Sequence, residues 1–159
     1  MNTEPTTGTT TELVLHLMAK PLEANGKAIR LNTPGLLVSA TLIADALQMG
    51  LMHPTADGKK IQLAEGWHTH PHPVAQSLVY ALPKKYQQPE HIAKAKTSLM
   101  WLTTLHTRLG MPSHLRKMAE FWDVWTIERQ RVMRIFSNTF ARPTHPEARQ
   151  AAAQGILEV

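Results

Sequence analysis

The residues best suited to chemistry lie in a short segment rich in histidine and proline. It reads Gly66-Trp67-His68-Thr69-His70-Pro71-His72. Two imidazoles two positions apart, together with a carboxylate, can give Zn²⁺ three protein ligands and leave a fourth position for an attacking water. A zinc hydrolase that uses His68 and His70 is therefore one alternative function, and His72 can join them in an adventitious metal site.

This segment resembles the zinc-binding motif of the JAMM-type isopeptidases, in which His-x-His-Pro is followed by a Ser and, three residues later, by an Asp ligand. Here Ser77 follows the histidines, but Tyr80 stands at the position of the Asp. A missing charged ligand is hard to replace, so the sequence favours a binding function over hydrolysis.

Lys59 and Lys60 indicate a second alternative, a winged-helix-like regulator that binds nucleic acid. They lie beside Asp57-Gly58, a turn signal between two short alternating runs, which predicts a β-hairpin. Lysines at the tip of such a wing can contact phosphates. The preceding helix, however, would have to read base edges with polar side chains. Residues 36–47 are nearly all apolar or small, so we expect that helix in the core.

Composition limits the other possibilities. The chain has 159 residues, a formal charge of +5 and no cysteine, which favours anionic partners and excludes a disulfide scaffold or a thiolate metal site. No run of about 18 apolar residues is present, and the polar N-terminus lacks a signal-peptide pattern. We therefore expect no transmembrane segment and a cytoplasmic location, with peripheral attachment to the inner membrane surface as an option.

Hydrophobic periodicity predicts a mostly α, compact single-domain fold with two small β-hairpins. Residues 1–10 are expected to be a disordered tail, and 11–159 the domain. A helix over 36–47 is expected at the centre, with Ala40 and Ala44 enclosed by the chain's own neighbours. The expected helices cover 11–20, 36–47, 74–82, 89–109 with a break near Thr97, 112–122 and 147–157, and the hairpins cover 51–63 and 124–136 with the second turn at Glu128–Arg131.

The order of these elements resembles the Golgi phosphoprotein 3-like domain family. Its short first helix is similar to Glu12–Leu17, and its buried central helix, which ends in a Leu-rich stretch and a glycine, is similar to Leu42–Leu51. The family's later helix and hairpin resemble Leu115–Phe136, and its Arg-Pro closing segment resembles Phe140–Pro146. In lacking the long basic leader of the eukaryotic members, the sequence resembles the bacterial-type members.

This resemblance implies a helical, non-catalytic adaptor that attaches to membranes through phosphatidylinositol 4-phosphate and self-associates through its hairpin. Ile29 and Val38 stand where the family has the Trp and Arg of its lipid site, with Arg30 next to the first. The candidate headgroup bases are therefore Arg30, Arg108, Arg116 and Lys117. The candidate hairpin for a protein partner or a homo-oligomer comprises Leu51, Met52, Lys59, Lys60, Ile61 and Leu63.

The leading prediction is thus a non-catalytic peripheral adaptor or binding domain without a cofactor. It would bind anionic lipid headgroups and protein partners, and nucleic-acid binding is the first alternative.

Overall fold

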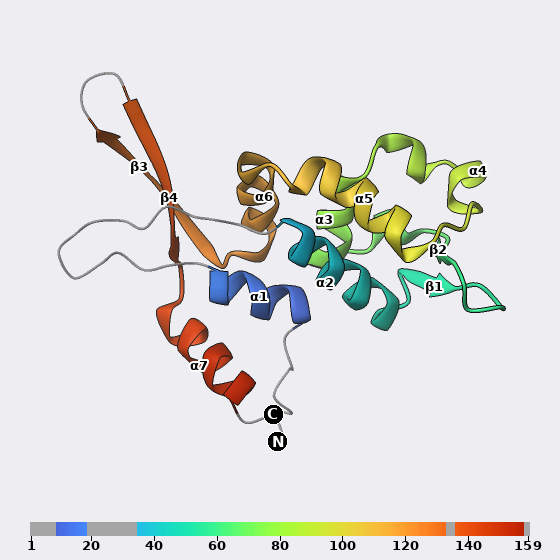
Figure 1. Cartoon of the computed structure of the whole chain (residues 1–159), viewed down its shortest axis with the longest axis horizontal. Helices are drawn as coiled ribbons and strands as arrows, with labels where there is room; N and C mark the ends of the chain where they lie inside the picture. Colours follow the sequence, from blue (N-terminus) through green and yellow to red (C-terminus); the bar gives the residue numbers. More distant parts are fainter. Residues whose placement is uncertain (1–8, 19–34, 133–135, 158–159) are drawn as a thin grey trace.

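The computed structural model describes residues 9–18, 35–132 and 136–157, and these residues form a mostly helical fold with two β-hairpins (Figure 1). This confirms the fold class expected from the sequence. The helices are α1 (Thr10–Met18), α2 (Gly35–Gln48), α3 (Pro73–Ala81), α4 (Pro89–Ile92), α5 (Ser98–Leu109), α6 (Pro112–Ala119) and α7 (Pro146–Leu157). The strands are β1 (Met52–Pro54), β2 (Ile61–Leu63), β3 (Trp125–Val132) and β4 (Phe136–Pro143), and short 3₁₀ turns cover Trp67–Thr69, Lys84–Gln87 and Glu120–Trp122.

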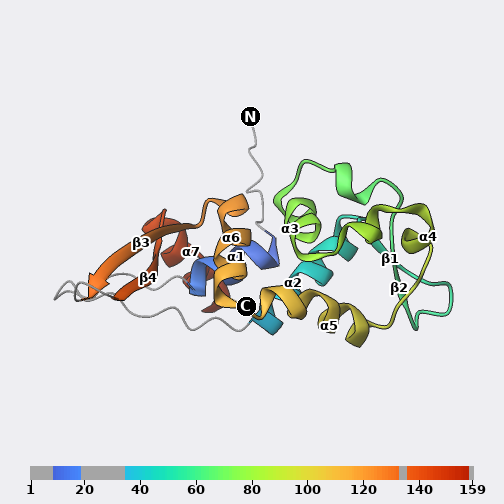
Figure 2. The ribbon, with the colours of Figure 1, turned by 90° about the horizontal axis from the view of Figure 1, so that it is seen from above.

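Helix α2 lies at the centre and packs against α1, α3, α5 and β1 (Figures 1 and 2). Val38, Leu42 and Ala46 are completely buried in its core face. The expectation that Ala40 and Ala44 are enclosed was wrong, because both are exposed. The described neighbours cover only part of the circumference of α2, so one apolar stripe remains open along its length.

Four buried tryptophans connect distant parts of the chain. Each indole N–H donates a hydrogen bond inside the core, which satisfies the polar atom that burial would otherwise leave without a partner. The acceptors are the Tyr86 carbonyl for Trp67 (3.1 Å), the Ile61 carbonyl for Trp101 (2.9 Å), the Ser77 hydroxyl for Trp122 (2.8 Å) and the Leu15 carbonyl for Trp125 (2.7 Å). These bonds fix α1, the first hairpin and α3 to the C-terminal half of the core.

The first hairpin forms where Asp57-Gly58 predicts it. Strands β1 and β2 are antiparallel, with Met52 opposite Leu63 and Pro54 opposite Ile61. Its apolar residues Leu51, Met52, Ile61 and Leu63 are buried in the chain's own core, and only Lys59 and Lys60 of the predicted partner surface are exposed. The apolar part of that prediction was wrong, because three-residue strands have no stable sheet of their own and must bury their side chains against the helices.

Acidification is expected to loosen the tip of this hairpin. The Thr55 hydroxyl (2.6 Å) and the Lys59 N–H (3.1 Å) donate to the Asp57 carboxylate and hold its pKa below the ordinary 3.8. The stabilisation is therefore complete above that ordinary value and is lost as the pH falls through the lower, folded pKa. A lower protection factor for the Lys59 amide in acid, taken relative to the intrinsic exchange rate at the same pH, checks this expectation. An Asp57→Asn variant should lose the pH dependence, and a persistent one would contradict it.

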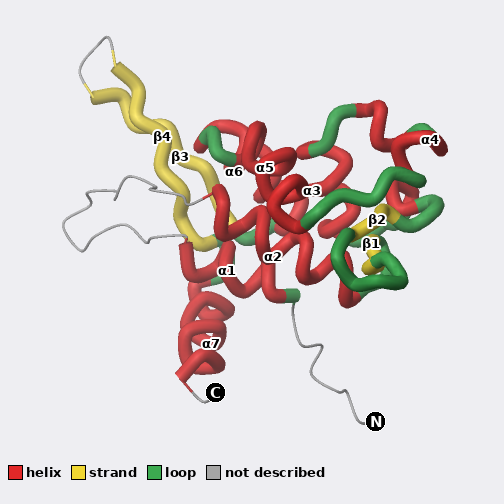
Figure 3. Tube along the Cα trace, turned by 45° about the vertical axis from the view of Figure 1, so that its right-hand side comes forward, coloured by secondary structure: helices red, strands yellow, loops and turns green. Residues whose placement is uncertain are grey.

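The second hairpin is longer than predicted. The polar run Glu128–Arg131 does not turn but pairs within the ladder, with Glu128 opposite Phe140 and Arg131 opposite Ser137, so the predicted turn was wrong. Residues 133–135 between the strands lie outside the described residues. Since the ribbon extends away from the helices (Figure 3), it accepts polar residues along its strands, and Glu128–Arg131 contains none of the usual turn residues Gly, Pro, Asn or Asp.

The remaining boundaries agree closely with the expected ones. Helix α3 ends before Pro83, and α4 and α5 are separate helices, with the Thr97 hydroxyl accepting the Met100 N–H at the start of α5 (3.3 Å). Helix α1 already begins at Thr10, while the rest of the predicted tail, residues 1–8, lies outside the described residues. None of the described helices is both long and apolar enough to cross a membrane.

Candidate anion-binding site

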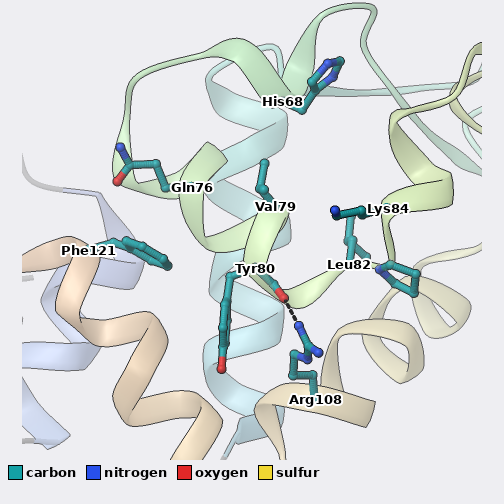
Figure 4. A pocket seen from close by; sticks show the side chains of 9 residues that line it. His68, Gln76, Val79, Tyr80, Leu82, Lys84, Arg108 and Phe121 are labelled. Atoms are coloured by element: carbon teal, nitrogen blue, oxygen red, sulfur yellow. Dashed lines mark hydrogen bonds between the residues drawn. The ribbon is translucent and has the colours of Figure 1, made fainter.

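The outer face of α3 forms the floor of a pocket of about 670 Å³, a size typical of small-molecule sites (Figure 4). The pocket is completed by a histidine of the loop before α3, the segment after α3, the last turn of α5 and the 3₁₀ turn after α6. Its lining residues are His68, Gln76, Val79, Tyr80, Leu82, Pro83, Lys84, Arg108 and Phe121.

The sequence of α3 explains why this face is available. Val74, Ala75 and Leu78 bury the inner face of the helix. Gln76, Val79 and Tyr80 are three and four residues apart, so they share the opposite face. His72 accepts the Val74 N–H (3.1 Å) at the N-cap with Pro73 in the first turn, which fixes the start of the helix.

Tyr80 and Arg108 form the best-defined part of the pocket. The Arg108 guanidinium donates a hydrogen bond to the Tyr80 carbonyl (2.7 Å) and lies 5.1 Å from the centre of the Tyr80 ring. The same ring packs edge-on against Phe121, and its hydroxyl is 2.7 Å from Nδ1 of His114. A cation over an aromatic face is attracted to it, so these contacts hold the guanidinium at the pocket.

The charge of the lining is positive. Lys84 and Arg108 contribute cations, and the pocket-lining residues include no Asp or Glu. Nδ1 of His68 is buried without a hydrogen-bond partner, so this ring has hydrogen-bonding capacity left over. Val79, Leu82 and Phe121 add apolar and aromatic surface to the lining. This arrangement suits an anionic group, such as a phosphate, that is attached to a less polar body.

The structure does not bring the predicted headgroup bases together at one site. Arg108 lines the pocket, whereas Arg116 and Lys117 do not, and Arg30 and Ile29 lie outside the described residues. Lys117 instead pairs with Glu120 (2.9 Å), which raises the pKa of Lys117 above its usual value. Val38, which aligns with the family's headgroup Arg, is 0% exposed and contributes only to the core. Any anion site in the described chain is therefore built differently from the one expected.

The three histidines do not converge on a common point. The His70 ring accepts the backbone N–H of His72 (3.1 Å), and the His72 ring caps α3. Within residues 9–18, 35–132 and 136–157, no group of three His, Cys, Asp or Glu side chains is placed to hold a metal ion. The described geometry gives no support to the alternative zinc site at His68, His70 and His72, because a helix cap and a turn already engage two of the rings.

The geometry also gives little support to base reading by α2. Its exposed stripe consists of Leu36, Leu37, Ala40 and Ala44, followed by Gln48. Its single charged residue, Asp45, is buried. The stripe thus lacks the row of polar side chains that direct readout in the major groove requires.

Sequence reasoning missed Lys84, Tyr80 and His68 as members of one site. The available signal was the spacing of Gln76, Val79, Tyr80 and Pro83, which marks a second stripe on α3 opposite its buried one. That spacing does not show which distant residue faces the stripe. The partner, Arg108, is 28 positions from Tyr80.

No protein-family model and no curated protein matches the chain, so comparison with known proteins assigns it neither a family nor a function.

Proposed function

We propose that the protein is a non-catalytic adaptor of the Golgi phosphoprotein 3-like type that attaches to membranes by binding an anionic phospholipid headgroup in the α3–α5 pocket. One observation carries this proposal: Lys84 and Arg108 both line a pocket whose lining contains no acidic residue and several apolar ones. Two cations suit a phosphate, while Val79 and Leu82 suit the less polar part of the headgroup region.

The guanidinium is the principal ligand in this proposal. Arg108 uses one N–H on the Tyr80 carbonyl. A guanidinium has five N–H donors in a planar fork, so the others can engage phosphate oxygens in pairs. Lys84, which is exposed and lies on the same side of α3 as Arg108 (Figure 4), would add a point charge. The net charge of +5 favours approach to an anionic surface.

Arg108→Ala is expected to weaken binding to anionic vesicles roughly fivefold, because each base at such a surface contributes about 1 kcal/mol. Flotation with phosphatidylcholine vesicles, with and without added phosphatidylinositol 4-phosphate or phosphatidylglycerol, measures this change. Adding salt should weaken wild-type binding, since screening reduces the attraction. Arg108→Lys should recover only part of the loss, because it restores the charge without the fork.

Lys59→Ala is the matched control, because it removes one exposed charge from the hairpin tip, away from the pocket. Equal losses in Lys59→Ala and Arg108→Ala would mean that only net charge matters, and would contradict the pocket. Titration of the protein with inorganic phosphate and with a soluble inositol phosphate separates recognition of a free phosphate from recognition of a headgroup at a bilayer.

A further inference from the structure

The open side of the α2–α5 helix pair is an apolar surface without a partner in the described chain. Five large apolar side chains are exposed among the residues whose burial is described, and they lie on α2, on α5 or directly after α5: Leu36, Leu37, Leu99, Met100 and Met111. Leu99 is 72% exposed and Leu36 is 53% exposed. Single exposed apolar residues are ordinary, but their concentration on one helix pair indicates a contact surface.

Three threonine hydroxyls of α5 already have acceptors within the helix. The hydroxyls of Thr103, Thr104 and Thr107 donate to the carbonyls of Leu99 (2.9 Å), Met100 (2.7 Å) and Thr103 (2.8 Å). Because these hydroxyls donate to carbonyls of the preceding turn, they keep their hydrogen bonds when the surface is covered. Burial of α5 would therefore cost little desolvation.

The surface also carries no carboxylate, lysine or arginine. Asp45 is the only acid of α2, and it is buried against α1. Arg108 follows Leu99 by nine positions, which places the two about 180° apart around α5, whereas it lies only about 80° from Met100 and so borders that edge of the surface. A second copy centred on Leu99 and the α2 stripe would thus meet no like charge from lysine or arginine, although the chain as a whole carries +5.

The shape of this surface allows it to pack against the same surface of a second copy. Leu99 and Met100 project from α5, whereas Ala40 and Ala44 form a shallow stripe on α2. The two helices are antiparallel neighbours, because Gly35 at the start of α2 packs against Leu109 and Gly110 at the end of α5. A two-fold axis through the pair would place the large residues of each copy over the small residues of the other.

We infer that this surface, formed by Leu36, Leu37, Ala40, Ala44, Leu99, Met100 and Thr103, is the interface with a second copy of the chain. The choice of a protein over a lipid rests on the proposed function: with the Arg108 pocket against the bilayer, the opposite side of α5 faces away from it.

Sedimentation velocity over a concentration series tests the interface. The wild type is expected to dimerise reversibly in the micromolar range. Leu99→Glu should raise the dimer dissociation constant at least tenfold without changing the melting temperature, because the side chain is exposed in the monomer. Ala56→Glu, which places the same charge on the exposed hairpin tip, should leave dimerisation unchanged. A monomeric wild type, or a dimer that tolerates Leu99→Glu, overturns the inference.

The absence of native cysteine allows a second, direct measurement. A Thr103→Cys variant treated with a short bis-maleimide should form covalent dimers, and an Ala56→Cys variant should not. Equal cross-linking in both variants would indicate random collision and contradict the interface.

Vesicle flotation of the same variants separates this inference from the proposed function. Leu99→Glu should still bind anionic vesicles above the background of neutral ones, and Arg108→Ala should still dimerise. If Leu99→Glu instead abolishes vesicle binding while the wild type is monomeric, the surface inserts into lipid and the dimer is overturned. If Arg108→Ala binds vesicles normally while Leu99→Glu is monomeric, the pocket assignment fails and the interface stands.

Discussion

Asp45→Ala is expected to destabilise the fold by about 3 kcal/mol, because it removes the carboxylate that holds the start of α1. Asp45 is 1% exposed and accepts the backbone N–H groups of Thr10 (3.0 Å) and Thr11 (2.7 Å). Both N–H groups belong to the first turn of α1, which has no internal acceptors for them and carries the positive end of the helix dipole. Without the carboxylate, the buried Thr11 N–H loses its partner.

Denaturant unfolding measures the change, and amide exchange at Thr10 and Thr11 locates it. Asp45→Asn keeps one acceptor oxygen but places an NH₂ group against a donor, so it should recover only part of the stability. Asp57→Ala is the comparison, because that aspartate bonds only at the exposed hairpin tip. A loss in Asp45→Ala no larger than in Asp57→Ala would show that the capping bonds contribute little.

Gly35→Ala is expected to cost about 2–3 kcal/mol, because it forces α2 and α5 apart. A Cβ at Gly35 would overlap the carbonyl oxygen of Leu109 and lie 2.8 Å from Cα of Gly110. Both are backbone atoms, so no side-chain rotation can relieve the overlap. Elsewhere in a helix, Gly→Ala would stabilise the fold by up to about 1 kcal/mol. A loss of stability in Gly35→Ala would therefore by itself indicate the close contact between α2 and α5.

Thermal and denaturant unfolding of Gly35→Ala, compared with Gly50→Ala, tests this expectation. Gly50 has a positive φ of 74° but nothing within 4 Å of its Cβ position, so alanine there should cost only about 1 kcal/mol of backbone strain. A Gly35→Ala protein as stable as the wild type would mean that the helices do not approach so closely.

The sequence predicted features that depend on neighbouring residues. Helical spacing located α3, and Asp57-Gly58 located the turn of the first hairpin. The predicted turn at the hydrophilic run Glu128–Arg131 was wrong, because polarity alone does not distinguish a turn from a paired strand.

By itself, the sequence determined the helices, the first hairpin and the positive charge, since these follow from side-chain types and short-range spacing, whereas Arg108 became a candidate only through the resemblance to the Golgi phosphoprotein 3-like family. Only the tertiary structure decided that Arg108 meets Tyr80 and Lys84 in one pocket, that the histidines do not converge, and that Ala40 and Ala44 are exposed. The physical reason is that exposure and proximity depend on which elements pack together, and residues 28 positions apart carry no local mark of their contact.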